Sequence, residues 1–86
     1  MATISLTAQI SITPKSDILD PQGKAVLKAL HELGYDEVVD VNVGRTIILT
    51  CAVPVEGYSL NRLDEMCRRF LANINTESYT IQTSES

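Results

Sequence analysis

The chain has 86 residues, 44% of them hydrophobic and 21% charged, and a formal net charge of −4 at pH 7. An acidic chain repels a phosphate backbone, and no apolar run approaches the roughly 18 residues of a membrane-spanning helix, so neither nucleic acid nor a membrane is expected as a partner. A chain this short has room for one core, so we expect a single domain over residues 1–86. Small domains bury only about 60 to 65% of their unfolded surface, which makes self-association or partner subunits a further expectation.

The first predicted element is a β-strand over residues 4–13. Apolar residues alternate with polar ones along it, which is the period of a strand with one buried face. The apolar set is Ile4, Leu6, Ala8, Ile10 and Ile12. The opposite face carries only hydroxyl groups and one amide, so it is uncharged and another chain can cover it.

A helix is predicted over residues 21–33. Asp20 supplies a side-chain acceptor for the free N–H groups of the first turn, and Pro21 fits the first helical position because it has no N–H to leave unpaired. An apolar stripe follows at helical spacing, formed by Val26, Leu30 and Leu33. Gly23 is unusual, since glycine in a helix costs about 1 kcal/mol relative to alanine. Either a strand packs closely against the helix there, or another backbone or a ligand approaches the helix N-terminus.

Residues 39–43 and 46–53 are predicted to form a β-hairpin with a turn at Gly44 and Arg45. In the second of these strands one face is apolar, and the other face is partly apolar as well. A strand with two apolar faces is normally covered on both sides. The residues predicted to form an oligomer interface on the second face are Ile48, Thr50 and Ala52.

A second helix is predicted to start at Ser59 and to continue to about residue 74. Its predicted buried stripe consists of Leu60, Leu63, Cys67, Phe70, Leu71 and Ile74. Two acidic residues of this helix have a basic residue four positions later, the spacing of exposed ion pairs that contribute about 0.2–0.5 kcal/mol each. These pairs are Asp64 with Arg68 and Glu65 with Arg69. Residues 79–83 are then predicted to form a last strand.

The resulting order, βαββαβ, predicts an α+β fold of the ferredoxin-like type. We expect an antiparallel sheet with two helices on one face and the other face used in oligomerisation. Many unrelated functions share this fold, so the function has to be argued from particular residues.

No catalytic, cofactor-binding or metal-binding group of residues stands out in the sequence. His31 is the only histidine and falls on the polar stripe of the first helix with Lys24 and Lys28, so it is predicted to be a surface residue. Cys51 and Cys67 lie in apolar contexts without CxxC spacing, which predicts free thiols in a reducing cytoplasm. We therefore expect the chain to act by binding other proteins and not by catalysis of its own.

Residues 19–45, with the sequence LDPQGKAVLKALHELGYDEVVDVNVGR, resemble the signature region of the PurS family, the small subunit of phosphoribosylformylglycinamidine synthase. The resemblance continues through residues 46–53, the helix end at 67–73 and residues 77–79. Ile74 stands where the family commonly has proline. The resemblance implies a PurS-like domain over nearly the whole chain.

What the resemblance implies is a non-catalytic subunit of a cytoplasmic, ATP-dependent ligase complex of de novo purine biosynthesis. In that complex a glutaminase subunit makes ammonia, and a large synthetase subunit uses ATP and Mg to convert formylglycinamide ribonucleotide to its amidine. The small subunit bridges the two and self-associates as a homodimer or homotetramer. The family's catalytic residues lie on the other two subunits, so the resemblance assigns no catalytic residue, cofactor or metal to this chain.

The start of the first helix is a candidate partner interface, because it combines the costly glycine with a basic stripe on an acidic protein. Its residues are Asp20, Pro21, Gln22, Gly23, Lys24, Lys28 and His31. A rival hypothesis is a small-molecule-sensing module resembling the ACT domain, whose ligand turn also joins a first strand to a first helix through Asp, Pro and Gly. In this chain Gln22 separates the proline from the glycine, which would misplace that turn. A purely structural oligomer outside purine synthesis is a further alternative.

Overall fold

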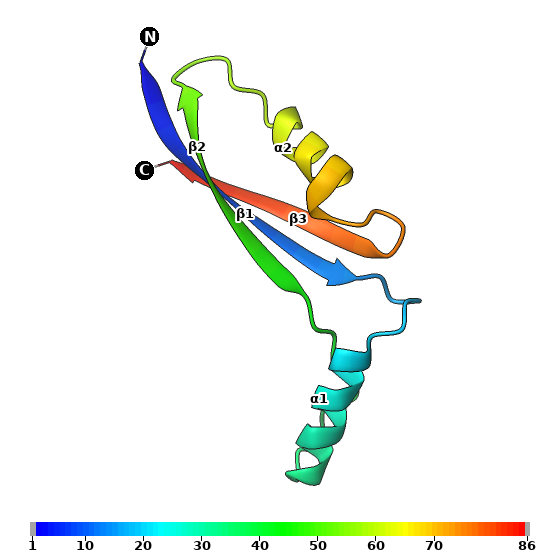
Figure 1. Cartoon of the computed structure of the whole chain (residues 1–86). Helices are drawn as coiled ribbons and strands as arrows, with labels where there is room; N and C mark the ends of the chain where they lie inside the picture. Colours follow the sequence, from blue (N-terminus) through cyan, green and yellow to red (C-terminus); the bar gives the residue numbers. More distant parts are fainter. Residues whose placement is uncertain (1, 86) are drawn as a thin grey trace.

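The structure, a computed structural model, describes residues 2–85 and contains one antiparallel sheet and two helical segments (Figure 1). In chain order the elements are β1 (Thr3–Pro14), α1 (Pro21–Glu32), β2 (Arg45–Pro54), α2 (Asn61–Met66), the π-helical turn η1 (Cys67–Leu71) and β3 (Glu77–Glu85). The turn η1 directly continues α2, and the two form one helix. The predicted α+β class with an antiparallel sheet is confirmed.

Strand β1 is the centre of the sheet, whose order is β2-β1-β3 with both neighbours antiparallel to it. The predicted alternation of β1 is confirmed, because Ala8, Ile10 and Ile12 are fully buried. Ile10 lies opposite Ile47 of β2 and Ile81 of β3. One face of the sheet is therefore apolar across all three strands.

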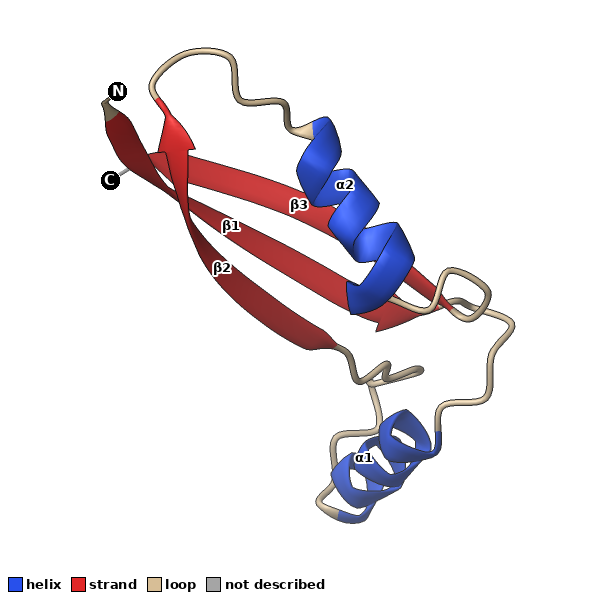
Figure 2. Cartoon of the chain, turned by 45° about the horizontal axis from the view of Figure 1, so that its top comes forward, coloured by secondary structure: helices blue, strands red, loops and turns tan. Residues whose placement is uncertain are grey.

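The α2–η1 helix covers this apolar face (Figure 2). Leu63 and Cys67 of the helix are fully buried in the core between helix and sheet. The wider stripe predicted for this helix is wrong at three positions, since Leu60, Phe70 and Ile74 are 55%, 87% and 50% exposed. Leu60 and Ile74 lie outside the helix, which spans Asn61–Leu71. Phe70 lies in η1, whose wider turn, closed by a bond from the N–H of Ala72 to the carbonyl of Cys67, breaks the 3.6-residue period on which that stripe rested.

Residues 39–43 do not form the predicted strand, so the described chain has three strands where four were predicted. They run back beside α1 and away from the edge of β2 (Figure 2). The N–H of Val43 donates to the carboxylate of Asp20 at 2.8 Å, and the carbonyl of Val38 accepts from the ring of His31 at 2.7 Å. The helix holds this segment, and the predicted hairpin does not form.

Helix α1 lies beyond the end of the sheet (Figure 1). The prediction that both helices lie on one face of the sheet is wrong, because only the α2–η1 helix lies there. We call residues 20–43, which comprise α1 and the segment that returns beside it, the arm. The molecule measures 57 Å along its longest axis and has a radius of gyration of 17.2 Å, whereas a compact domain of this length has about 12 Å. The projecting arm accounts for the difference.

Candidate functional site

The base of the arm is organised by the carboxylate of Asp20. One oxygen accepts a hydrogen bond from the N–H of Gly23 at 2.9 Å and so caps α1, as predicted. The other oxygen accepts from the N–H of Val43 at 2.8 Å. The N–H groups of Gly23 and Val43 favour the ionised form and hold the pKa of Asp20 below its ordinary value. A single side chain thus starts the helix and fastens the returning segment to it.

Gly23 is explained by this internal contact. A Cβ atom at this position would lie 2.2 Å from the carbonyl oxygen of Val41 and 2.7 Å from the carboxylate of Asp20. Both distances are shorter than van der Waals contact, so only glycine allows the returning backbone to come so close. The strand expected to pack here does not form, and the backbone that approaches the start of the helix is that of Val41 in the returning segment of the same chain.

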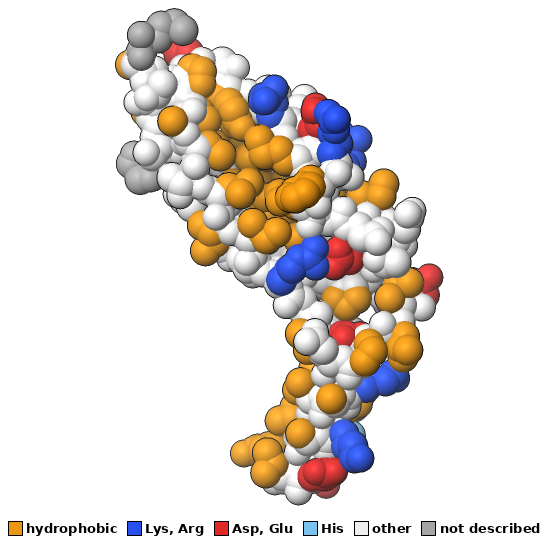
Figure 3. Space-filling model, in the orientation of Figure 1, with side chains coloured by type: hydrophobic (Ala, Val, Ile, Leu, Met, Phe, Trp, Pro, Cys, Tyr) orange, Lys and Arg blue, Asp and Glu red, His pale blue; other side chains and the backbone are white. Residues whose placement is uncertain are grey.

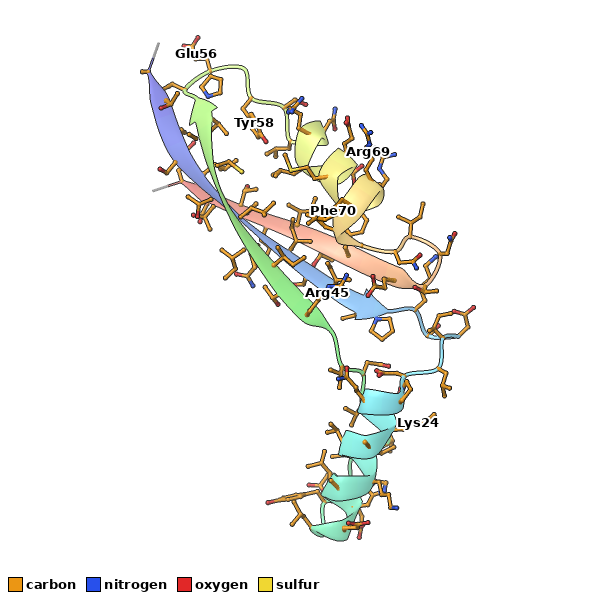
Figure 4. The ribbon with its side chains drawn as sticks, viewed as in Figure 1. Lys24, Arg45, Glu56, Tyr58, Arg69 and Phe70 are labelled. Atoms are coloured by element: carbon orange, nitrogen blue, oxygen red, sulfur yellow. The ribbon has the colours of Figure 1, made fainter. Side chains whose placement is uncertain are left out.

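The other residues of the predicted partner interface form an exposed surface. Pro21, Gln22, Lys24, Lys28 and His31 are all exposed, and Figure 4 shows Lys24 projecting from the arm. Within residues 2–85, neither lysine takes part in an ion pair. Asp20 and Gly23 are therefore a buried or half-buried scaffold, and His31 is exposed but bonded to the carbonyl of Val38. The side chains of Pro21, Gln22, Lys24 and Lys28 are the ones available to a partner.

The predicted oligomer interface belongs to a larger surface, the side of the sheet that the α2–η1 helix leaves open. We call it the back face, and the pairing of the strands assigns fifteen residues to it: Thr3, Ser5, Thr7, Gln9, Ser11, Thr13, Thr46, Ile48, Thr50, Ala52, Pro54, Ser78, Thr80, Gln82 and Ser84. None of the fifteen is charged, although 21% of the whole chain is. Ile48, on the edge strand β2, is 64% exposed. An uncharged sheet face of this extent is suited to cover by another protein surface.

A second uncovered surface lies beside the α2–η1 helix. It is a concave surface of about 330 Å³, which we call the groove. Its lining residues are Leu49, Arg62, Glu65, Met66, Arg69, Phe70 and Leu71. Phe70 is 87% exposed and stands at its margin with Arg69 (Figure 4). Hydrophobic side chains gather in this part of the molecule and again along one edge of the arm (Figure 3). Sequence reasoning missed the groove, because it assigned Phe70 to the buried side of the helix.

An arginine joins the ends of three elements near the base of the groove. Arg45 donates to Glu77 at 2.5 Å and to the carbonyl of Leu71 at 2.7 Å. Glu77 also accepts from the N–H of Asn73 at 2.8 Å. The Arg45 side chain and that N–H hold the pKa of Glu77 below its ordinary value. These bonds fix where β2, η1 and β3 meet, and no local sequence pattern indicated them.

A second polar contact fastens the helix to β3. The hydroxyl of Tyr79 donates to the carboxylate of Asp64, whose other oxygen accepts from Arg68 at 2.8 Å. The Tyr79 hydroxyl, and to a smaller extent Arg68, keep the pKa of Asp64 below its ordinary value. The predicted pair of Asp64 with Arg68 is confirmed, as is the pair of Glu65 with Arg69 at 3.3 Å.

The described chain offers few other reactive or metal-ligating groups. Both cysteines are free thiols, as predicted, and burial raises the pKa of Cys67. Residues 2–85 contain no cluster of three or more His, Cys, Asp or Glu side chains placed to hold a metal ion. No helix in this part of the chain has the length and apolar character needed to cross a membrane. What the structure offers is a set of surfaces for contact with proteins.

The fold and these surfaces define the class: a small α+β protein built for association. Comparison with known proteins then places the chain more narrowly. Residues 7–85 match the family model PurS, described as phosphoribosylformylglycinamidine (FGAM) synthase. The chain is 40% identical over 78 residues to the phosphoribosylformylglycinamidine synthase subunit PurS of Synechocystis sp., covering 91% of this chain and 78% of that protein. This chain belongs to the PurS family.

Solved structures agree with the assignment. The fold matches PurS of Bacillus subtilis with a TM-score of 0.81 at 35% identity, covering 93% of this chain and 99% of that one. It also matches a chain in the structure of PurLQS from Thermotoga maritima, with a TM-score of 0.80, 20% identity, and coverage of 93% and 98%. The second match shows a common fold.

Proposed function

We propose that this chain is the non-catalytic small subunit of phosphoribosylformylglycinamidine synthase in de novo purine biosynthesis. In this proposal it bridges a glutaminase subunit and a large synthetase subunit in the cytoplasm. The complex converts formylglycinamide ribonucleotide to its amidine with ATP and glutamine, and the ATP and Mg are bound by the large subunit. The observation that carries the proposal is the family match over residues 7–85.

Two further observations support membership of a complex. A chain of the same fold occurs in the PurLQS structure from Thermotoga maritima. In addition, the described chain exposes the back face and the groove, both of which are suited to cover by protein. Neither the family match nor the related structures support the ACT-like sensor.

The exposed lysines of α1 are the part of the predicted partner interface that we assign to another subunit. Lys24 and Lys28 project from the arm of an acidic chain, and His31 lies one turn further along the same helix. An acidic patch on a partner would meet them with complementary charge and would speed association. Asp20 and Gly23 position this surface, because they fix the start of the helix that carries it.

The back face is the surface that we assign to self-association, giving a homodimer or homotetramer. Ile48, Thr50 and Ala52 lie opposite Gln9, Thr7 and Ser5 of β1, so the apolar part of this face follows the β2 edge of the sheet. Two such faces can pack without burying an unpaired charge. Ile48→Asp should lower the oligomer mass in sedimentation equilibrium, whereas Val55→Asp, the same change at an exposed loop position, should leave it unchanged. Equal masses for both variants would count against the back face.

Co-purification tests the proposed function itself. The tagged chain is mixed with the glutaminase and synthetase subunits of the same organism, in the presence of glutamine and Mg-ATP. Both subunits should be retained with the tagged chain, in fixed proportion, through a second column. If neither subunit is retained, the assignment to this complex is wrong.

A further inference from the structure

A pocket of about 320 Å³ lies at the end of the sheet where β1 begins and β2 ends. Ile4, Leu6 and Val53 line its apolar floor, and Val55 and Leu60 stand at its margin. Both margin residues are 55% exposed. We call this the end pocket. Large exposed apolar side chains around a concave apolar floor form a surface suited to cover by a partner.

The loop between β2 and α2 forms one wall of the end pocket. Its start is held by a hydrogen bond from the N–H of Val55 to the carbonyl of Ala2 at 3.4 Å. Gly57 turns the loop with a φ of +84°, a left-handed conformation that glycine adopts without strain. Tyr58 follows and packs against the core cluster that includes Val53. The wall is therefore held in place by contacts within the single chain.

The charged side chains around the end pocket are acidic. Glu85 lines the pocket, Glu56 lies between the lining residues Val55 and Gly57, and no lysine or arginine lines it. Neither glutamate takes part in an ion pair within residues 2–85. Arg62, the next basic residue along the chain, lines the groove instead. An apolar floor with an acidic margin favours a segment that carries an apolar side chain beside lysine or arginine.

The shape of the end pocket suits a protein side chain better than a small molecule. Small-molecule pockets usually bury about 70–90% of the ligand surface. Here the margin is open, since Val55 and Leu60 are both more than half exposed. An anchoring side chain of a protein needs only its tip in the pocket, because the residues beside it cover the margin and exclude water.

The end pocket and the lysines of α1 lie at opposite ends of the molecule. Figure 4 shows Glu56 and Tyr58 on the loop that follows β2, and Lys24 on the arm beyond the other end of the sheet. The longest axis of the molecule measures 57 Å. A subunit that bridges two others needs surfaces far enough apart for both partners to bind at once. Opposite charge at the two ends also keeps each partner from the wrong end, because like charges would meet there.

We infer that the end pocket binds a basic segment of one partner subunit, whose apolar side chain enters the pocket, while the lysines of α1 hold the other subunit. This inference rests on the proposed function, because it takes the glutaminase and synthetase subunits as the two partners. It adds where each subunit attaches and which chemistry each attachment uses. The lysines take an acidic surface, and the end pocket takes an apolar side chain flanked by positive charge.

Photocrosslinking in the assembled complex tests the placement of the two partners. A benzophenone amino acid replaces Val55 at the margin of the end pocket in one protein, and Gln22 beside Lys24 in another. Both positions are exposed, so the replacement should leave the fold unchanged. After co-purification with the glutaminase and synthetase subunits, glutamine and Mg-ATP, the two positions should cross-link to different subunits.

Substitutions test the chemistry of the end pocket. Val55→Asn with Leu60→Asn should lower retention of the cross-linked subunit about tenfold. Leu60 is the N-cap residue of α2, a position that asparagine favours, so the helix should be kept. The matched control is Leu19→Asn with Ile74→Asn, at apolar positions that are 70% and 50% exposed outside the pocket, and it should retain both subunits.

A charge change tests the acidic margin separately. Glu56→Lys with Glu85→Lys should weaken retention of the same subunit, whereas Asp36→Lys with Glu37→Lys, the same charge change on the arm, should not. The inference is overturned if both cross-linking positions reach the same subunit, if the pocket position reaches only a second copy, or if the pocket variants and their controls behave alike. If the unchanged chain retains neither subunit, the proposed function itself fails, and the inference fails with it.

Discussion

The carboxylate of Asp20 accepts a hydrogen bond from the backbone N–H of Val43 at 2.8 Å, across 23 positions of sequence. The same side chain caps α1 through the N–H of Gly23. The start of the helix and the end of the returning segment are thus fastened at one point. This contact makes residues 20–43 a unit that projects from the sheet, and it decides where the exposed residues of α1 are presented.

The close packing at Gly23 predicts that Gly23→Ala destabilises the protein. Helix propensity alone would favour alanine by about 1 kcal/mol. The added Cβ would meet the carbonyl oxygen of Val41 at 2.2 Å, so the net change should be a loss of about 1–3 kcal/mol of unfolding free energy. Urea unfolding at one fixed protein concentration measures it, with Gln22→Ala at the exposed neighbouring position as control. A more stable Gly23→Ala protein would show that the contact is not made.

Three carboxylates give the chain a predicted loss of stability in acid. The pKa values of Asp20, Asp64 and Glu77 are lowered from ordinary values of 3.8, 3.8 and 4.5. A lowered pKa in the folded state means that the stabilisation is fully present above the ordinary value and is lost as pH falls below it. Urea midpoints should therefore be level near pH 6 and fall steadily from about pH 4.5 downward. Asp20→Asn and Glu77→Gln should each flatten this fall, and profiles parallel to wild type would contradict the assignment.

The ion pair of Arg45 with Glu77 should be worth more than the helix pairs. Arg45 is half-exposed but bonds both Glu77 and the carbonyl of Leu71, so a double-mutant cycle to alanine should give a coupling of about 0.5–1 kcal/mol after solvent screening. The control cycle uses Arg69 and Glu65, which are 3.3 Å apart and largely exposed, and should give less than about 0.5 kcal/mol. Equal couplings would mean that the Arg45 contact is an ordinary surface pair.

Local patterns located most of the elements. The alternation of Leu6, Ala8, Ile10 and Ile12 identified β1, and the cap at Asp20 identified the start of α1. The i,i+4 charge pairs of the second helix were also predicted and are present. These features depend on neighbours in sequence, which is why sequence alone could find them.

Features that depend on how one part of the chain packs against another were not predicted. The alternation of residues 39–43 indicates an extended segment but does not specify whether that segment pairs with a strand or packs beside a helix. In this chain the hydrogen bond from Val43 to Asp20 holds it beside the helix. The stripe that includes Leu33 predicts a covered face on α1, but a stripe does not specify which surface covers it, and Leu33 is 73% exposed in the described chain. Phe70 was misplaced because a π-helical turn leaves no mark in the spacing of apolar residues.

The lysines of α1 give a prediction for the assembled complex. Replacing Lys24 and Lys28 together with Glu should weaken retention of a partner subunit about tenfold or more, because like charges would then meet. Added salt should lower retention of the unchanged chain by screening the attraction, and should raise retention of the variant by screening the repulsion. The control is Arg62→Glu with Arg69→Glu, the same charge change on the other helix, measured by the same co-purification. Retention that is unaffected by the lysine changes would remove α1 from the partner interface.

The central claim, that this chain serves phosphoribosylformylglycinamidine synthase, is tested most directly by turnover of the reconstituted enzyme. The glutaminase and synthetase subunits are assayed with Mg-ATP and formylglycinamide ribonucleotide, with and without this chain, using glutamine or ammonia as the nitrogen source. We predict that glutamine-dependent turnover requires the chain, whereas ammonia-dependent turnover by the synthetase persists without it. Equal glutamine-dependent rates with and without the chain would contradict the assignment.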